Sequence, residues 1–244
     1  MSHIPQWIRT QIIARGVTDP RILAALTKVP RHEFVPASMR YFAYDDSPLP
    51  IGNGQTISQP YIVAYMTDLA EPKATDKALE IGTGCGYQAA VLSQVVNHLY
   101  SIEIVEPLAE QAKQTLERLG YPNISLRCGD GYEGWPEEAP FDIILLTAAP
   151  PKVPQTLFDQ LKVGGRLVAP VGTWDQTIVR WTKLSDTEYK QEDFIPVRFV
   201  PMTGKAQGEE VRHRDNGDLE GADDDESKSS LRSLLSTMLG RKDH

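Results

Sequence analysis

The sequence has little of what marks a secreted, membrane-spanning or nucleic-acid-binding chain. It contains two cysteines, Cys85 and Cys128, which are too few for a disulfide framework and fit a reducing compartment. Its apolar runs fall short of the roughly 18 residues that span a membrane. Lys and Arg number 25 against 33 Asp and Glu. The resulting net charge of −8 disfavours binding to phosphate backbones.

Signals for export, metal binding and triad chemistry are also missing. Arg9 and Arg15 interrupt the N-terminal apolar stretch, which therefore lacks the core of a signal peptide. The histidines have no spacing typical of a catalytic triad, and no cluster of His, Cys, Asp and Glu has metal-ligand spacing. We expect a cytoplasmic protein with no metal, no membrane association and no nucleic-acid partner.

Composition divides the 244 residues into a body and a tail. We predict one domain over 1–204, with an N-terminal helical and active-site loop region at 1–76 and a cofactor-binding core at 77–204. Residues 205–229 lack aromatic side chains and are rich in acids, which is typical of a disordered linker. Residues 230–242 carry leucines and a methionine at helical spacing, which predicts a short amphipathic helix. That helix either docks on its own body or binds a separate protein partner.

The core alternates strand and helix patterns from residue 77 onward. Nearly continuous apolar runs, typical of strands buried on both faces, occupy 77–81, 98–105, 124–128, 141–149 and 165–172. Helical patterns lie between most of them, including one at 153–162. The runs 177–184 and 193–202 have no helix between them and should pair antiparallel at the sheet edge. The pattern predicts an α/β fold with a doubly wound, mostly parallel, Rossmann-like sheet and an antiparallel edge strand.

Helices are expected to precede this sheet. Apolar residues at helical spacing form one stripe near Trp7 and a second near Leu23. The pair Asp19-Pro20 is a start signal for the second helix.

A glycine-rich turn follows the first core strand. Residues 82–86 read Gly-Thr-Gly-Cys-Gly between a predicted strand and a predicted helix. Glycines there permit positive φ and let backbone N–H groups approach a ligand. A dinucleotide fingerprint would need a third glycine where Tyr87 stands, which argues against a nicotinamide oxidoreductase. Glu103 ends the next strand, where its carboxylate can accept both hydroxyls of a ribose. The alternative is a plain tight turn with a strand-end acid.

This pattern resembles the class I S-adenosylmethionine-dependent methyltransferases. The resemblance implies that the turn cradles the methionine part of S-adenosylmethionine, that Glu103 binds the ribose, and that Asp130 accepts a hydrogen bond from the adenine amino group. Asp130 with Gly131 could also be only a turn. The cofactor-binding residues implied are Glu80, Gly82, Thr83, Gly84, Cys85, Gly86, Tyr87, Glu103, Asp130 and Gly131.

Ser58 is ambiguous from local chemistry alone. It precedes Gln59-Pro60 and an apolar-periodic run, so its simplest role is the N-cap of a helix. No base stands near it in the sequence, so a hydrolytic triad is unsupported.

Four blocks of the chain, at 31–36, 45–60, 80–90 and 197–204, resemble the protein-L-isoaspartate O-methyltransferases. The resemblance implies methyl transfer to isoaspartyl residues in damaged proteins and peptides, with Ser58 as the active-site residue that contacts the acceptor carboxylate. It also implies that Thr56, Ile57, Val200 and Thr203 line the substrate cleft. Cys85 stands where a serine is common in relatives, and the tail lies beyond the resemblance.

Two alternatives to this function stay open at this point. One is a class I methyltransferase with another acceptor, such as a small molecule or RNA. The other is a non-catalytic adaptor that kept the fold and gained a recruiting tail.

Overall fold

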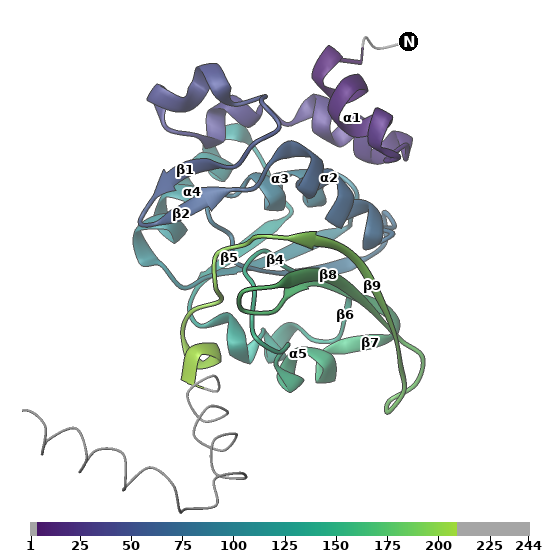
Figure 1. Ribbon diagram of the computed structural model, residues 1–244. Coiled ribbons are helices and arrows are strands. Elements are labelled where there is room, and N and C mark those ends of the chain that lie inside the picture. The colour runs from purple at the N-terminus through teal and green to yellow at the C-terminus, as the bar shows by residue number, and fades with distance from the viewer. Residues whose placement is uncertain (1–3, 209–244) are drawn as a thin grey trace, which may run out of the picture. The chain divides into compact units, whose positions relative to one another are not determined.

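The computed structural model describes residues 4–208, and residues 4–207 belong to one compact unit (Figure 1). A seven-stranded sheet forms its centre, in the order β5-β4-β3-β6-β7-β8-β9. In chain order its strands are β3 (Lys77–Ile81), β4 (His98–Glu103), β5 (Ile124–Cys128), β6 (Phe141–Leu146), β7 (Leu161–Val171), β8 (Gln176–Lys183) and β9 (Tyr189–Val197).

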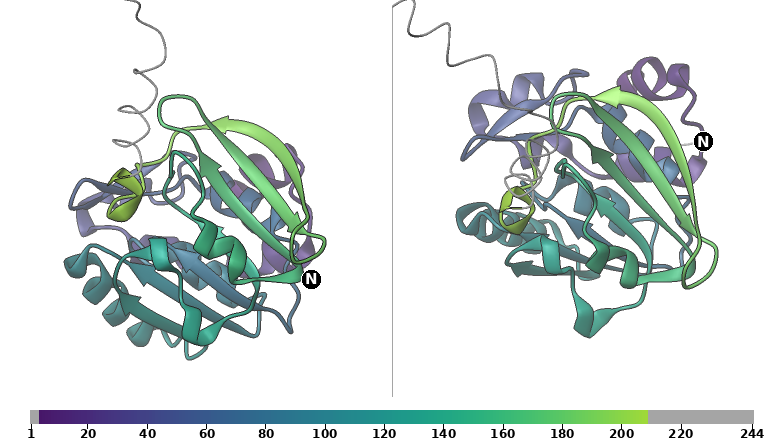
Figure 2. Two further views of the ribbon diagram at one scale, coloured as in Figure 1. Left: turned by 90° about the horizontal axis from the view of Figure 1, so that it is seen from below. Right: turned by 60° about the horizontal axis from the view of Figure 1, so that its bottom comes forward.

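The sheet is parallel except at one edge. Strands β3 to β7 pair in parallel, whereas β8 pairs antiparallel with both β7 and β9. The views in Figure 2 show β8 and β9 side by side along this edge. The predicted doubly wound α/β fold is confirmed. Because β3 lies between β4 and β6, the connections run away in opposite directions there and leave a crevice at the strands' carboxyl ends.

Helices cover the sheet, and a small ribbon lies beside it. The α-helices are α1 (Pro20–Lys28), α2 (Pro60–Leu69), α3 (Tyr87–Ser93), α4 (Glu106–Leu119) and α5 (Gln155–Asp159). In Figure 1, α1, α2 and α3 lie on one side of the sheet and α5 on the other. The ribbon pairs β1 (Leu49–Gly52) with β2 (Gln55–Ile57), directly before α2. Single-turn helices are η1 (Ile8–Ile12), η2 (Ile13–Arg15), η3 (Arg31–Phe34), η4 (Ala37–Phe42), η5 (Gly131–Glu133) and η6 (Pro136–Glu138).

Successive side chains of each strand point to opposite faces of the sheet, which divides the core into two layers. On β3, Ala78 packs with the cluster under the N-terminal helices, whereas Leu79 and Ile81 pack with the cluster on the other face. Both faces are therefore buried, as the nearly continuous apolar strand runs predicted.

The N-terminal segment is only partly the helix pair that its apolar spacing predicted. The start signal before α1 is confirmed, because the Asp19 carboxylate accepts a hydrogen bond from Arg21 N at 2.8 Å. The first stripe forms a π-type turn and a 3₁₀ turn instead of an α-helix. Gly16, with φ of 97°, ends it after two short turns, while Ile8 and Ile12 still reach the core.

Two predicted elements are shorter in the structure than in the sequence pattern. The helix predicted at 153–162 is α5, and it ends at Asp159 because Leu161 already pairs with Phe141 of the sheet. The strand predicted at 193–202 ends at Val197. Residues 198–202 therefore leave the sheet and become available to the crevice.

The body continues past its predicted end at Gly204. Lys205 N donates to the Asp130 carboxylate at 2.9 Å, and Ala206 is buried. At least residues 205–207 therefore belong to the body, and not to the predicted linker. The remainder of that linker, from 209, and the helix predicted at 230–242 lie outside the described residues. Within residues 4–208, no helix has both the length and the apolar character needed to cross a membrane.

Candidate active site

The glycine turn at the end of β3 depends on backbone conformations that favour glycine. Gly82, Gly84 and Gly86 have φ of 99°, 55° and 88°. A side chain at Gly82 would also overlap Thr147 Oγ1, and one at Gly86 would lie 3.3 Å from Leu116. The turn therefore packs closely against its neighbours and exposes its main chain toward the crevice.

Glu103 fixes the other side of the crevice at the end of β4. Its Oε2 accepts a hydrogen bond from Gly84 N at 2.7 Å, and its Oε1 accepts one from Val105 N at 2.8 Å. Only 5% of the residue is exposed. A carboxylate has about four lone-pair sites, so each oxygen can accept one further hydrogen bond. Glu103 is thus held in place and retains capacity for two ligand hydroxyls.

Glu80 supports the turn from behind. It is fully buried, and its Oε2 accepts a hydrogen bond from Ser101 Oγ at 2.6 Å. The same Ser101 hydroxyl lies 2.6 Å from Thr83 Oγ1, so the three side chains form a chain beneath the turn. Burial, with the nearby Glu103 charge, raises the pKa of Glu80 from its ordinary 4.5 to about 8.

An open cavity lies in the crevice at the carboxyl ends of the strands, where this fold places its ligands. Most of the residues predicted for cofactor and substrate line it. They are Thr56, Ile57, Ser58, Gly82, Thr83, Gly84, Cys85, Tyr87, Glu103, Gly131, Val200 and Thr203. Three predicted residues, Glu80, Gly86 and Asp130, do not line it.

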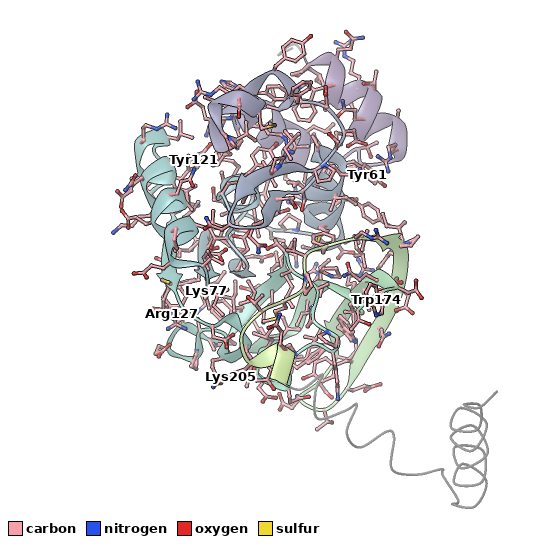
Figure 3. The ribbon with its side chains drawn as sticks, turned by 60° about the vertical axis from the view of Figure 1, so that its left-hand side comes forward. Tyr61, Lys77, Tyr121, Arg127, Trp174 and Lys205 are labelled. Atoms are coloured by element: carbon pink, nitrogen blue, oxygen red, sulfur yellow. The ribbon has the colours of Figure 1, made fainter. Side chains whose placement is uncertain are left out.

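The Asp130 carboxylate is engaged by the main chain. Its Oδ1 accepts a hydrogen bond from Tyr132 N at 3.0 Å and caps the η5 turn, while its Oδ2 accepts one from Lys205 N. Figure 3 shows Lys205 beside the last described turn of the chain. The turn role considered for Asp130 is therefore realised, and its contact with adenine stays a prediction.

A buried cation stands behind the wall formed by Cys85 and Tyr87. The Arg31 guanidinium lies 4.8 Å from the Tyr87 ring centroid and is fully buried. Within the described residues, its Nη1 and Nη2 and the Tyr87 hydroxyl have no hydrogen-bond partner. Burial raises the pKa of Cys85 to about 11, so this wall presents a neutral thiol at neutral pH.

Ser58 is not the N-cap of α2, so that interpretation is wrong. The helix begins at Pro60 and Gln59 occupies the N-cap position, because the proline ring suits the first helical residue. Ser58 is half-buried, and its hydroxyl has no hydrogen-bond partner among residues 4–208. The residue is therefore available to a ligand.

A second open cavity, of about 660 Å³, adjoins the first. The residues that line both are Thr56, Ser58, Thr147 and Val200. Sequence reasoning missed Thr147, although it directly follows β6 at a strand's carboxyl end, where this fold places ligand-contacting residues. Ser58 thus stands where the two cavities meet.

Gln176 holds the segment that passes between the cavities, and the sequence offered no signal for it. Phe199 N donates to its Oε1 at 2.6 Å, and its Nε2 donates to Phe199 O at 3.1 Å. This side chain is buried at the start of β8. It pairs the main chain of Phe199, which has left the sheet, while Val200 O accepts a hydrogen bond from Ala149 N at 2.9 Å.

The fold agrees with that of solved methyltransferases. A structure named protein-L-isoaspartate O-methyltransferase superposes with a TM-score of 0.75 at 33% identity, covering 83% of this chain and 67% of that one. A Plasmodium falciparum protein, described as a beta-aspartate methyltransferase in complex with S-adenosyl-L-homocysteine, shares the fold with a TM-score of 0.71 at 20% identity. It covers 83% of this chain and 99% of that one. The class is therefore that of the S-adenosylmethionine-dependent methyltransferases.

The family follows from the sequence comparisons. Residues 6–207 match the model of the protein-L-isoaspartate (D-aspartate) O-methyltransferase family. A protein-L-isoaspartate O-methyltransferase of Picosynechococcus sp. is 56% identical over 201 residues, which are 82% of this chain and 90% of that one. One from Opitutus terrae is 56% identical over 197 residues, which are 80% and 84% of the two chains. This chain belongs to the protein-L-isoaspartate O-methyltransferase family.

Proposed function

We propose that this chain transfers the methyl group of S-adenosylmethionine to the free carboxylate of L-isoaspartyl residues in damaged proteins and peptides, which initiates their repair. Relatives at 52% and 56% identity over about four-fifths of the chain bear the name of that enzyme. One structural observation carries the proposal. The partner-free Ser58 lines both the cavity that holds the glycine turn and Glu103 and the second open cavity.

The residues of the first cavity suit S-adenosylmethionine. The glycine turn would hold its methionine part, and the two free acceptor positions of Glu103 would take the ribose hydroxyls. When bound, this cofactor supplies an electrophilic methyl group on a positively charged sulfur. The cavity wall contributes shape and hydrogen bonds, and Glu80 keeps the turn in position from below.

The acceptor needs orientation more than activation. An isoaspartyl carboxylate has a pKa of about 4, so it is ionised at neutral pH and is already a nucleophile. The Ser58 hydroxyl would donate a hydrogen bond to one carboxylate oxygen and leave the other free for in-line attack. An arginine at this position would bind the anion more tightly and stabilise the ground state, which slows the reaction.

Residues on both sides of Ser58 would complete the acceptor site. Thr56 and Ile57 come from β2, and Val200 and Thr203 come from the segment after β9. Together they would exclude water from the reacting carboxylate. In this arrangement Ser58 is the catalytic residue, because it would touch the acceptor directly.

Two parts of the proposal rest on composition alone. The few cysteines favour a reducing compartment, and we propose the cytoplasm. The apolar pattern at 230–242 favours a protein partner for the tail.

Transfer of labelled methyl from S-adenosylmethionine tests the reaction. The full-length chain should label a peptide that contains one L-isoaspartyl residue and leave the matched L-aspartyl peptide unlabelled. Equal labelling of both peptides would favour a methyltransferase with another acceptor. Cofactor binding without any labelling would favour the adaptor.

A further inference from the structure

The second cavity differs in charge from the rest of this acidic molecule. Its charged lining residues are two arginines, Arg15 and Arg198, in a chain whose net charge is −8. No carboxylate among the described residues lines it. Arg15 is paired with Asp46, which does not line the cavity, so the unpaired positive charge comes from Arg198 and attracts a negatively charged group.

Arg15 is held in a fixed position at one end of the cavity. Its guanidinium lies 3.3 Å from the Tyr61 ring centroid, and its Nη1 lies 2.7 Å from Asp46 Oδ2. Tyr61 is visible in Figure 3. Asp46 shares its charge with two other donors, Tyr61 N at 3.2 Å and Gln59 Nε2 at 3.3 Å. The remaining N–H groups of Arg15 stay available to a second acceptor.

Arg198 also lines the cavity and is unpaired. It is exposed and forms no hydrogen bond or ion pair with any residue of the described range 4–208. The main chain beside it is held by Gln176 through Phe199, so the position from which Arg198 extends is fixed. An arginine with five free donors, extending from a main chain that is held in place, suits a carboxylate.

We infer that the second cavity is a subsite for an acidic side chain of the substrate, next to the isoaspartyl residue, with Arg15 and Arg198 as its cationic walls. The inference rests on the proposed function. The reacting carboxylate itself must reach Ser58, which lies on the border with the first cavity. Neighbouring residues of an extended peptide lie about 3.4 Å apart along the chain, so a residue close to one held at Ser58 is within reach of the second cavity, which Ser58 also lines.

Three isoaspartyl peptides that differ only in the flanking residue test the subsite. That residue is Glu, Gln or Lys, first before and then after the isoaspartyl position. For the full-length chain, kcat/KM should be about twofold to fivefold higher with Glu than with Gln, and lower with Lys, at one of the two positions. The preference for Glu should shrink at a salt concentration of about 0.5 M, because exposed charges are largely screened there.

Variants of Arg198 give the decisive comparison. R198Q should bring the Glu-to-Gln ratio close to one, and R198E should reverse the order so that Lys is preferred. K113Q is the matched control, because Lys113 is an exposed cation on α4 that lines neither cavity. It should keep the wild-type ratio.

The outcomes separate the subsite from the reaction. Equal kcat/KM for all three peptides in the wild type would overturn the subsite and leave the proposed function intact. A uniform loss in R198Q, with the ratio unchanged, would also overturn it and would indicate that Arg198 acts on the reacting carboxylate. No methylation of any peptide would overturn the proposed function and the subsite with it.

Discussion

The two cavities that meet at Ser58 are built in different ways. The wall of the first comes largely from the carboxyl ends of adjacent parallel strands, where β3 leads into the glycine turn and β4 ends at Glu103. The wall of the second comes from segments that are distant in the sequence, including Arg15 and the stretch from Ile195 to Val200. The first is fixed by the fold's own hydrogen bonds, and the second by side-chain contacts between distant segments.

The two cavities should therefore respond differently to substitution. The wall of the first cavity is formed by residues at the ends of the sheet's strands, so a substitution there affects folding and cofactor affinity together. The arginines of the second cavity, Arg15 and Arg198, lie outside the sheet, so a change at Arg198 should affect selectivity with little effect on stability. Four measurements test whether the two cavities differ in this way.

The largest effect is expected at Gly82. In Gly82→Ala the new methyl group would overlap Thr147 Oγ1 at a φ of 99°, which should lower the free energy of unfolding by about 3 kcal/mol. Gly54→Ala is the matched control, since its φ is 70° and a Cβ there meets nothing within 4 Å. That variant should lose about 1 kcal/mol. Equal losses in urea unfolding would show that close packing of the turn is unimportant.

Removal of the Glu103 carboxylate should weaken the cofactor site. Hydrogen bonds to a charged group contribute about 1.5–3 kcal/mol, so Glu103→Ala should weaken S-adenosylhomocysteine binding about 10-fold to 100-fold. Calorimetry measures this directly, with Glu103→Gln as the isosteric comparison. Unchanged affinity in Glu103→Ala would exclude its role in binding the ribose.

Ser58→Ala should act on turnover alone. Loss of one hydrogen bond to the acceptor carboxylate should lower kcat by about tenfold. Cofactor affinity should stay within about twofold, because the hydroxyl has no partner in the described structure. Steady-state kinetics and calorimetry on one preparation give both values. An equal loss of cofactor affinity would place Ser58 in the cofactor site instead.

The last measurement concerns the dependence of stability on pH and the contribution of Glu80 to it. Its raised pKa means that the folded chain keeps a proton on this group between pH 4.5 and about 8, whereas the unfolded chain has lost it. The unfolding free energy should therefore fall as pH rises through this window and level off above it. Glu80→Gln lacks this contribution, so its stability should decline less over the same range. Parallel pH curves from urea titrations of the two proteins would contradict the raised pKa.

Local sequence patterns predicted the sheet and the first cavity well. Apolar strand runs gave the doubly wound sheet, and the glycine spacing with the strand-end Glu103 located the residues that now line one cavity. These signals are local because a strand, a tight turn and a helix start each depend on consecutive residues. The boundaries of α5 and β9 were wrong because pairing with distant strands decides where they end.

The prediction of the residues around Ser58 depended on the family resemblance instead. Local chemistry made Ser58 an N-cap, and the structure gives that position to Gln59 because Pro60 begins the helix. Nothing in the sequence indicated that Gln176 would hold Phe199, since this contact joins the start of β8 to the segment that follows β9. Long-range contacts of this kind have no periodicity that could be detected.

The two hydrogen bonds between Gln176 and Phe199 affect how the substrate selectivity of this enzyme can evolve. Because both hydrogen bonds go to main-chain atoms, they are independent of which side chain stands at positions 198–200. Mutations there can alter what is presented to a substrate while the path of the chain stays the same. Substitutions at 198–200 could therefore change which damaged proteins the enzyme accepts during evolution, while the backbone of this segment keeps its position.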